Sequence, residues 1–366
     1  MAISLITCTM LVFRQVRFLR SQDKGINISE VLAVRAPRVR DASFGNKLLT
    51  YKQELLKNQV ITKFGLGTEV PGRQILWDAG GIYRVGSDQS KNYQIIGIDY
   101  DYLDLLEAKI VAGRNFDPSF SDSSSLILNV KATKWMEFKS PEEAVNQKID
   151  YWGNIYTVAG VVEDYHQQSP KAETEPHIFR FMPHGRDVRG FFMMKFLPGN
   201  EEKVLELAGK YYSDFFPDNP FDYFYLEDYY EQQYRDERLL GSVFGIFALL
   251  SVIITCMGIF GLTSFLMLQK TKEISIRRVL GSEVFSIIRL FSQDFIRIII
   301  VAFAIAVPIC YFWLTRWLNT FEVKMDISVW NFILPLVLTL LFTLLTIGFI
   351  VYKAASVNPA ENLRSE

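Results

Sequence analysis

One long segment without ionisable side chains constrains this chain more than any other feature of its sequence. The residues from Leu239 to Gln269 include no Asp, Glu, Lys or Arg. At about 1.5 Å per residue, a helix over this segment would be about 45 Å long, more than the roughly 30 Å hydrocarbon core of a membrane. Two further apolar runs follow, Ile298–Thr315 and Ile327–Tyr352. Because three such runs leave no polar face for water, we predict membrane-spanning helices rather than buried helices of a soluble protein.

The chain begins with a shorter apolar segment. A helix over Met1–Phe13 would be roughly 20 Å long, too short to span a membrane alone. The segment has neither a basic start nor a small-residue cleavage site, which disfavours a secretory signal peptide. We interpret it as the end of a transmembrane helix whose beginning is absent from this chain.

Charge and cysteine content exclude two broad classes of protein. The chain has 39 Lys and Arg against 40 Asp and Glu, a formal net charge of −1, which excludes a strongly basic nucleic-acid binder. Its three cysteines are too few for a disulfide scaffold, and all of them lie in apolar segments. No nucleic-acid partner is expected.

The basic residues between the apolar runs predict the orientation of the chain. Residues 270–297 contain more Lys and Arg than Asp and Glu, whereas the loop at 316–326 has equal numbers of each. Since cytoplasmic loops carry an excess of basic residues, residues 270–297 and the C-terminus are predicted to be cytoplasmic. Residues 14–240 then lie outside the cytoplasm. Arg14, Arg17 and Arg20 argue weakly for the opposite, but long domains translocate largely regardless of charge.

Residues 14–240 mix helical and strand patterns, which predicts an α+β domain with its own core. Helices are predicted at 44–58, after a cap at Asp99, from the capping box at Ser140 to about Gln147, and at 200–212. Strands are predicted at Tyr93–Ile98, Leu126–Val130, Ile155–Val162, Ile178–Phe181 and Phe191–Phe196.

No motif in the chain predicts catalysis. The segment Gly67–Gln74 has the glycine spacing of a P-loop but lacks its Lys and Ser/Thr, so we interpret it as a turn. Three histidines, His166, His177 and His184, occur near Glu163, Asp164, Glu173 and Glu175. Their spacing matches no tight ligand motif, so we favour a solvated loop over a metal site. We expect no catalytic, cofactor-binding or metal-binding residues.

The segment Gln269–Asp294 interleaves apolar and charged residues. Glu273 and Arg277 are spaced as an i,i+4 ion pair, and Gly281-Ser282 can end one helix and cap the next. A short amphipathic helix at the cytoplasmic surface is therefore predicted. It either rests on lipid headgroups or presents a surface to a cytoplasmic partner, and the residues alone do not favour one over the other.

Before the first long apolar run, residues 229–238 are helix-prone and contain no Gly or Pro. A single stiff helix could therefore carry displacement between the outer domain and the cytoplasmic segment; the alternative is a jointed linker at the membrane surface. Gly241 and Gly245 have the small-x-x-x-small spacing that permits close helix packing.

At residues 269–281, QKTKEISIRRVLG, the sequence resembles the coupling segment of FtsX-like, MacB-like ABC transporter permeases. The residues that fill the family pattern are Lys272, Glu273, Ile274, Ser275, Ile276, Arg277, Arg278, Val279, Leu280 and Gly281, with Ser275 where glycine is commoner. The ending Val357–Arg364 and three outer segments, YDYLDLLEAKIVAGRNF, LILN and YTVAGVVEDYH, are also similar to the family.

The resemblance implies a helical membrane bundle with a MacB-type outer domain. The implied parts are a truncated transmembrane helix (1–13), an extracytoplasmic domain with a stalk helix (14–240), transmembrane helices (241–268, 294–316 and 328–352), an ATPase-coupling segment (269–293), an outer loop (317–327) and a cytoplasmic tail (353–366). It further implies that the chain corresponds to the second half of a longer permease of the Bacteroidetes type.

The resemblance also implies partners and a location. A separate cytoplasmic ABC ATPase would bind ATP and Mg²⁺, and the permease itself would be non-catalytic. Further partners would be a second permease half or copy, a periplasmic adaptor and an outer-membrane channel, with the chain in the inner membrane and residues 14–240 in the periplasm. The implied role is export or mechanotransmission. The alternatives are a regulator of a cell-wall hydrolase, an antimicrobial-peptide sensor, or a nonfunctional fragment of a longer permease.

Overall fold

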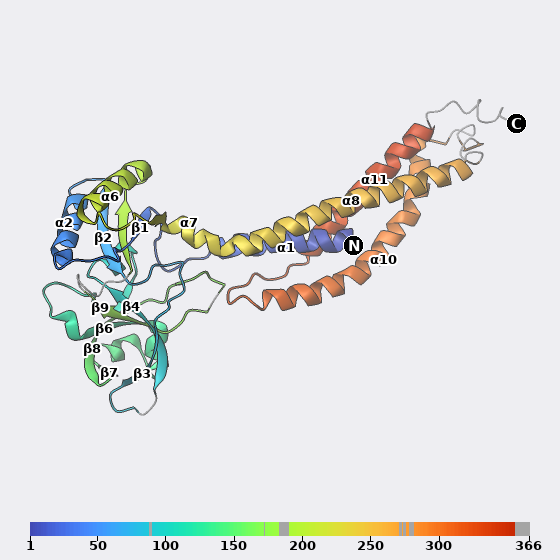
Figure 1. The fold of residues 1–366 in the computed structure, drawn as a ribbon. Helices are drawn as coiled ribbons and strands as arrows, with labels where there is room; N and C mark the ends of the chain where they lie inside the picture. The colour runs from blue at the N-terminus through green and yellow to red at the C-terminus, as the bar shows by residue number, and fades with distance from the viewer. Residues whose placement is uncertain are drawn as a thin grey trace. The chain divides into compact units, whose positions relative to one another are not determined.

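The computed structural model describes residues 1–87, 90–171, 173–182, 190–270, 273, 276–277 and 282–355. The chain divides into two compact units (Figure 1). The helical unit comprises Met1–Ser21 and Tyr234–Glu366, and the mixed unit comprises Gln22–Gln233. The chain therefore passes between the units twice, after residue 21 and after residue 233.

Four long helices make up the described part of the helical unit: α1 (Ala2–Ser21), α8 (Arg235–Gln269), α10 (Val284–Leu318) and α11 (Trp330–Ala355). All four contain stretches long and apolar enough to cross a membrane. Most large apolar side chains of α8 and α10 are exposed, which in water would be unfavourable and in lipid is not. The predicted fold class, a bundle of apolar helices with an additional α+β domain, is confirmed.

The helices extend beyond the apolar segments that predicted them. The first helix continues through Arg14 and Arg17 to Ser21, eight residues past the expected end of the apolar segment at Phe13. Similarly, α10 begins at Val284, inside the residues assigned to the coupling segment. In the first turns of this helix, Ile287, Phe291 and Phe295 are spaced four residues apart and are all buried. This face of α10 therefore packs against the other helices.

Two glycines of α8 allow α1 to lie directly against it (Figure 1). A Cβ atom on Gly241 would lie 3.2 Å from Val12 Cγ1, and one on Gly245 would lie 3.6 Å from Thr9 Cγ2. The first of these distances is tighter than ordinary van der Waals contact. The helices therefore lie close together at Gly241, and a side chain there would push them apart.

Polar side chains of α1 tie it to the α10–α11 loop and to the start of α11. Gln15 is fully buried; its amide donates to the carbonyl of Val323 (3.0 Å) and its carbonyl accepts from the N–H of Met325 (3.0 Å). Arg14 donates to the side-chain oxygen of buried Asn331. The loop between α10 and α11 thus has its backbone groups satisfied by a side chain more than 300 residues away in the sequence.

The mixed unit is built on one continuous set of paired strands. They are β1 (Val31–Arg35), β2 (Ile61–Gly67), β3 (Asp78–Arg84), β4 (Lys91–Ile98), β5 (Ile110–Gly113), β6 (Ser125–Asn129), β7 (Lys148–Tyr151), β8 (Asn154–Val162), β9 (His177–Phe181), β10 (Phe191–Phe196) and β11 (Tyr223–Tyr225). The five strands predicted from the sequence are present at β4, β6, β8, β9 and β10.

Four of these strands, in the order β11-β1-β10-β2, form an antiparallel sheet covered by α2 (Phe44–Leu56) and α6 (Glu201–Phe215). The buried ring of Tyr51 lies at the centre of its core, edge-on to Phe64 and Tyr212, and its hydroxyl donates to the carbonyl of Ala208. Alternate residues of β10, Phe192, Met194 and Phe196, face this core. Because every second residue of β10 faces this core, that side of the sheet packs against the two helices.

The other strands close on themselves. The order β4-β3-β7-β8-β6-β9 returns to its start because β9 pairs in parallel with β4 and antiparallel with β6. Strand β5 is added on β8, and β2 meets β4 through the pair Gly67–Ile98. Short helices α4 (Val130–Trp135) and α5 (Pro141–Ala144) contribute to the core inside this ring. The remaining short elements are α3 (Tyr102–Leu105) and a 3₁₀ turn at Asp122–Ser124.

Two local predictions were wrong in detail. The helix capped by Ser140 ends at Ala144 rather than near Gln147, and Asn146 adopts a left-handed conformation (φ 63°). Asp99 does not cap α3, whose N-cap is Asp101. Asp99 is buried instead and accepts hydrogen bonds from the N–H groups of Leu66 and Asp101.

The residues before α8 do not form one uninterrupted α-helix. Helix α7 (Leu226–Glu231) is followed by a 3₁₀ turn at Gln232–Tyr234, and α8 begins at Arg235. The single stiff helix considered from the sequence is therefore interrupted by a change of helix type. Such changes often mark a functional hinge or local strain.

A substitution at Gly241 tests the packing of α1 on α8. The Gly241→Leu variant places a branched side chain where even a Cβ meets Val12, and overpacking of this kind costs about 1–3 kcal/mol. The expected result is a lower thermal unfolding midpoint of the detergent-purified chain. Gly258→Leu is the matched control, since a Cβ on Gly258 meets no atom within 4 Å. Equal midpoints for the two variants would contradict the close approach.

Candidate functional site

The structure describes only part of the predicted coupling segment. Glu273, Ile276 and Arg277 are described and are exposed. The other predicted members lie outside the described residues: Lys272, Ile274, Ser275, Arg278, Val279, Leu280 and Gly281. The two predicted packing residues, Gly241 and Gly245, are placed on the face of α8 that meets α1.

The described residues of this segment carry a helical ion pair. The Arg277 guanidinium donates to the Glu273 carboxylate at 2.7 Å across one helical turn, and each side chain is 46% exposed. The carbonyl of Arg277 accepts from the N–H of Ser282 at 2.9 Å, and Glu283 then caps α10. An exposed pair of this kind contributes little to stability, so both charges remain accessible to a partner or to lipid headgroups.

A cluster of apolar side chains anchors both ends of the segment. The C-terminal part of α8 contributes Ile259 and Met267, the first turns of α10 contribute Ile287, Phe291 and Phe295, and the end of α11 contributes Ile347, Ile350 and Val351. Lys270, the last residue before the segment, places its ammonium 5.9 Å from the ring centroid of Phe291. The ends of α8 and α10 that flank the segment therefore share one apolar cluster with the end of α11.

The histidine-rich region of the mixed unit does not form a metal centre in the described residues. Among those residues no three His, Cys, Asp or Glu side chains converge as metal ligands, and His184 lies outside them. Lys109 and Lys131 form ion pairs with Glu163 and Glu173, respectively. The carboxylate of Asp164 accepts from the N–H of Lys131.

His177 is buried on β9 between the rings of Tyr165 and Phe179, 1% exposed. Neither of its ring nitrogens has a hydrogen-bond partner among the described residues. Desolvation by this apolar environment lowers the pKa of His177 from 6.5 to about 4. Burial has the opposite effect on an acid and raises the pKa of Asp99 from 3.8 to about 6, in spite of Lys52 at 3.7 Å.

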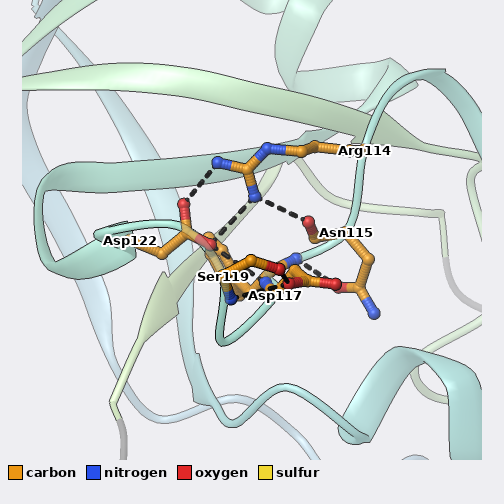
Figure 2. A network of polar contacts seen from close by, with 6 residues as sticks. Arg114, Asn115, Asp117, Ser119 and Asp122 are labelled. Atoms are coloured by element: carbon orange, nitrogen blue, oxygen red, sulfur yellow. Dashed lines mark hydrogen bonds and ion pairs between the residues drawn. The ribbon is translucent and has the colours of Figure 1, made fainter.

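The loop between β5 and β6 holds a tight polar network (Figure 2). Arg114 binds both carboxylate oxygens of Asp122, at 2.7 and 2.9 Å, and also donates to the carbonyl of Asn115. The Asp122 side chain is fully buried and accepts from the N–H of Asp117, while Asp117 accepts from Ser119. These bonds satisfy the groups within the loop itself, so the network shapes the loop.

The P-loop-like segment folds as a turn, as predicted. Strand β2 ends at Gly67, and neither helix nor strand follows until β3 begins at Asp78. A phosphate cradle of the P-loop type requires a helix to begin at the glycine-rich turn, and here none does.

One family model matches the C-terminal part of the chain. Residues 245–359 match the model of a protein family described as FtsX-like permease C-terminal. The resemblance predicted from the sequence is thereby confirmed. The matched range includes most of α8, all of α10 and α11 and the whole predicted coupling segment.

Two solved structures similar to this chain each cover more than half of it. One is the periplasmic region of MacB from Actinobacillus actinomycetemcomitans, with a TM-score of 0.42, 13% identity, and coverage of 59% of this chain and 97% of that one. Another is the extracellular domain of the noncanonic ABC-type transporter YknZ from Gram-positive bacteria, with a TM-score of 0.37, 11% identity, and coverage of 53% and 97%. A comparison with curated proteins found no match.

Sequence reasoning missed one cluster of charged residues. Arg35, Arg38 and Arg40 occur within six residues, RAPRVR, and the fold brings them close to Arg73 at the rim of a cavity. The density of arginines around Pro37 was the available signal. It went unused because nothing local indicates that a segment more than thirty residues later completes the cluster.

Substitution of His177 should change how stability depends on pH. The unfolded chain protonates this histidine near pH 6.5 but the folded chain only near pH 4, so the free energy of unfolding falls as the pH decreases between these values. Between pH 6.5 and 4, this histidine lowers the free energy of unfolding by about 3 kcal/mol in total. His177→Phe removes it, so the variant should gain stability relative to the parent between pH 6.5 and 4, measured as unfolding midpoints in detergent.

Asp99 provides the control of opposite sign. The folded chain protonates Asp99 near pH 6 and the unfolded chain near 3.8, so this acid stabilises the fold as the pH falls through the same window. Asp99→Asn should therefore lose stability relative to the parent as the pH falls. Parallel pH profiles for the parent and His177→Phe would contradict the assignment of His177 as a buried neutral group.

Proposed function

We propose that this chain is the permease subunit of an ABC transporter, coupling ATP hydrolysis by a separate ATPase to motion of its extracytoplasmic domain. The observation that carries the proposal is the family match over residues 245–359, which includes the segment predicted to bind the ATPase. The motion serves export or mechanotransmission. The permease itself is non-catalytic, and ATP and Mg²⁺ are bound by the partner.

The described geometry of the coupling segment supports this role. The Glu273–Arg277 pair is exposed, and Ile276 beside it is 54% exposed. A surface that combines fixed charges with an exposed apolar side chain is suited to docking a protein partner, with the charges setting orientation and the apolar group contributing buried area. The cluster of α8, α10 and α11 beneath it would transmit a displacement because packed cores are nearly incompressible.

The proposed placement follows from the same features. The four apolar helices cross the cytoplasmic membrane, the coupling segment faces the cytoplasm and the mixed unit lies in the periplasm. The proposed assembly contains a second permease half or copy beside this chain, with a periplasmic adaptor and an outer-membrane channel as further partners.

Charge reversal in the coupling segment tests the ATPase partnership. The double variant Arg277→Glu/Arg278→Glu should lower the ATPase activity that co-purifies with the tagged chain from membranes of its host by at least about tenfold, since losing interfacial charge pairs costs about 2–5 kcal/mol. Membrane insertion should be unchanged. Lys203→Glu, a reversal at an exposed residue of α6, is the control and should retain the ATPase.

Exchanging the charges of Glu273 and Arg277 distinguishes a role in docking a partner from a role in stabilising the helix. Glu273→Arg/Arg277→Glu preserves an ion pair across the same helical turn but exchanges the positions of the charges. If the segment docks a partner, the swap also loses the ATPase. Full retention of ATPase activity by the double reversal and by the swap would refute the coupling assignment.

Thiol labelling tests the orientation. In a chain lacking Cys8, Cys256 and Cys310, a cysteine at the exposed position Lys171 should react with a membrane-impermeant maleimide on intact spheroplasts. A cysteine at exposed Glu283 should react only after permeabilisation. The reverse pattern would invert the proposed topology.

A further inference from the structure

A cavity of about 550 Å³ in the mixed unit is lined by an unusual number of guanidinium groups. Its volume is within the range of small-molecule sites, about 300–1,000 Å³. The lining residues that matter for its chemistry are Arg35, Arg38, Arg40, Thr68, Glu69 and Arg73, with Phe191 at its base. We refer to this cavity as the arginine pocket.

Strand pairing explains why these residues meet. Phe191 begins β10, and it pairs with Arg35 at the end of β1 on one side and with Gly67 at the end of β2 on the other. The chain leaves β1 toward Arg38 and leaves β2 toward Arg73, so both segments flank Phe191. Gly190 permits this closeness, since a Cβ there would lie 2.2 Å from the carbonyl oxygen of Gly67.

The aromatic ring of Phe191 supports two of the guanidinium groups. The guanidinium carbons of Arg73 and Arg35 lie 5.2 and 6.0 Å from the ring centroid. Phe191 is 2% exposed, and its ring packs edge-on to Phe224, so the platform is fixed. Cation–π contacts of this kind hold arginine heads in place without consuming their N–H donors.

The arginines between β1 and α2 are positioned through the backbone. The side-chain oxygen of Asn219 accepts from the N–H groups of Arg38 and Val39, at 2.7 and 2.8 Å, and its amide donates to the carbonyl of Val39. Arg40 donates from Nε to the carbonyl of Pro37, and its guanidinium lies 4.4 Å from the ring centroid of Phe44. The segment is thereby held as a defined turn at the pocket.

Two of the four guanidinium groups form ion pairs with acidic side chains that the structure describes. Arg35 pairs with Asp222 at 3.0 Å and Arg73 with Glu69 at 3.6 Å, each through Nε. Both carboxylates therefore bind at the Nε side of the two guanidinium groups. Each paired guanidinium keeps further N–H donors on its terminal nitrogens.

Two uncharged contributions also favour an anion. The hydroxyl oxygen of Thr68 accepts from the N–H of Gly97 at 2.9 Å, which leaves the hydroxyl proton to donate. Burial raises the pKa of Glu69, although Arg73 opposes the shift, and this reduces the repulsion that an anionic ligand would meet.

We propose that the arginine pocket binds the phosphate group of a phosphomonoester. A dianionic phosphomonoester presents three terminal oxygens that the forks of several arginines can bind at once, whereas a carboxylate presents only two. The ester substituent occupies the rest of the cavity. The described residues that line the pocket all belong to the mixed unit, and the proposal does not rest on the ATPase partnership.

Titration calorimetry of the full chain in detergent micelles tests the site. The probes are sodium phosphate, glycerol 3-phosphate and short-chain phosphatidic acid, with sodium acetate and short-chain phosphatidylcholine as comparisons at constant ionic strength. We expect saturable binding of phosphate probes and none of acetate. Saturation by glycerol 3-phosphate indicates a soluble ester, whereas saturation by phosphatidic acid alone indicates a lipid headgroup.

Variants link the binding to the pocket. Arg38→Ala removes an exposed side chain and should weaken phosphate binding about tenfold, the loss of roughly one charge-assisted hydrogen bond. Phe191→Leu keeps an apolar side chain but removes the aromatic platform, and should weaken binding while leaving all four arginines. Lys203→Ala, an equal loss of charge on exposed α6, should bind as the parent does.

Three results would overturn the proposal. They are the absence of saturable binding of any phosphate probe by the parent chain, acetate binding as tight as phosphate binding, and phosphate binding that Arg38→Ala and Lys203→Ala weaken equally. Circular dichroism of each variant, expected to match that of the parent, shows that altered binding is not caused by unfolding.

Discussion

The close approach of α1 and α8 at Gly241 is the contact on which the architecture depends. The chain enters the mixed unit at the end of α1 and leaves it just before α8, so these helices carry both of its covalent connections. Their packing therefore joins the two helices from which the chain continues into the mixed unit. The contact depends on the absence of a side chain at Gly241 and, one turn further on, at Gly245.

Much of the fold could be predicted from the sequence because its signals are local. Runs without charge locate α8, α10 and α11, and period-2 segments locate β4, β6, β8, β9 and β10. The extension of α1 past Phe13 could not be predicted, since Gln15 is accommodated only through the backbone of Val323 and Met325. Asp99 was assigned as a cap for a similar reason, because its partner at Leu66 is brought near only by the pairing of strands.

The two sites differ in how far sequence could reveal them. The coupling segment is contiguous, so its residues could be assigned by their resemblance to a family pattern, and the family match covers the same range. The arginine pocket is assembled from the ends of β1, β2 and β10, and only the register that sets Phe191 opposite Arg35 and Gly67 brings its parts together. The turn at 67–74 is informative in this respect. It lacks the residues of a nucleotide-binding loop, yet its Thr68 and Arg73 contribute to a different anion-binding surface.

The closed circuit of strands has a consequence for the order in which the mixed unit folds. Residues 94–98 of β4 pair with residues 177–181 of β9, so the circuit needs a contact across more than eighty residues of sequence. During synthesis it cannot close until Phe181 has left the ribosome, and until then β4 and β6 expose unpaired edges. Such long-range pairing is slow compared with local structure formation. Until β9 is synthesised and paired, the edges of β4 and β6 that it covers are therefore available to other chains.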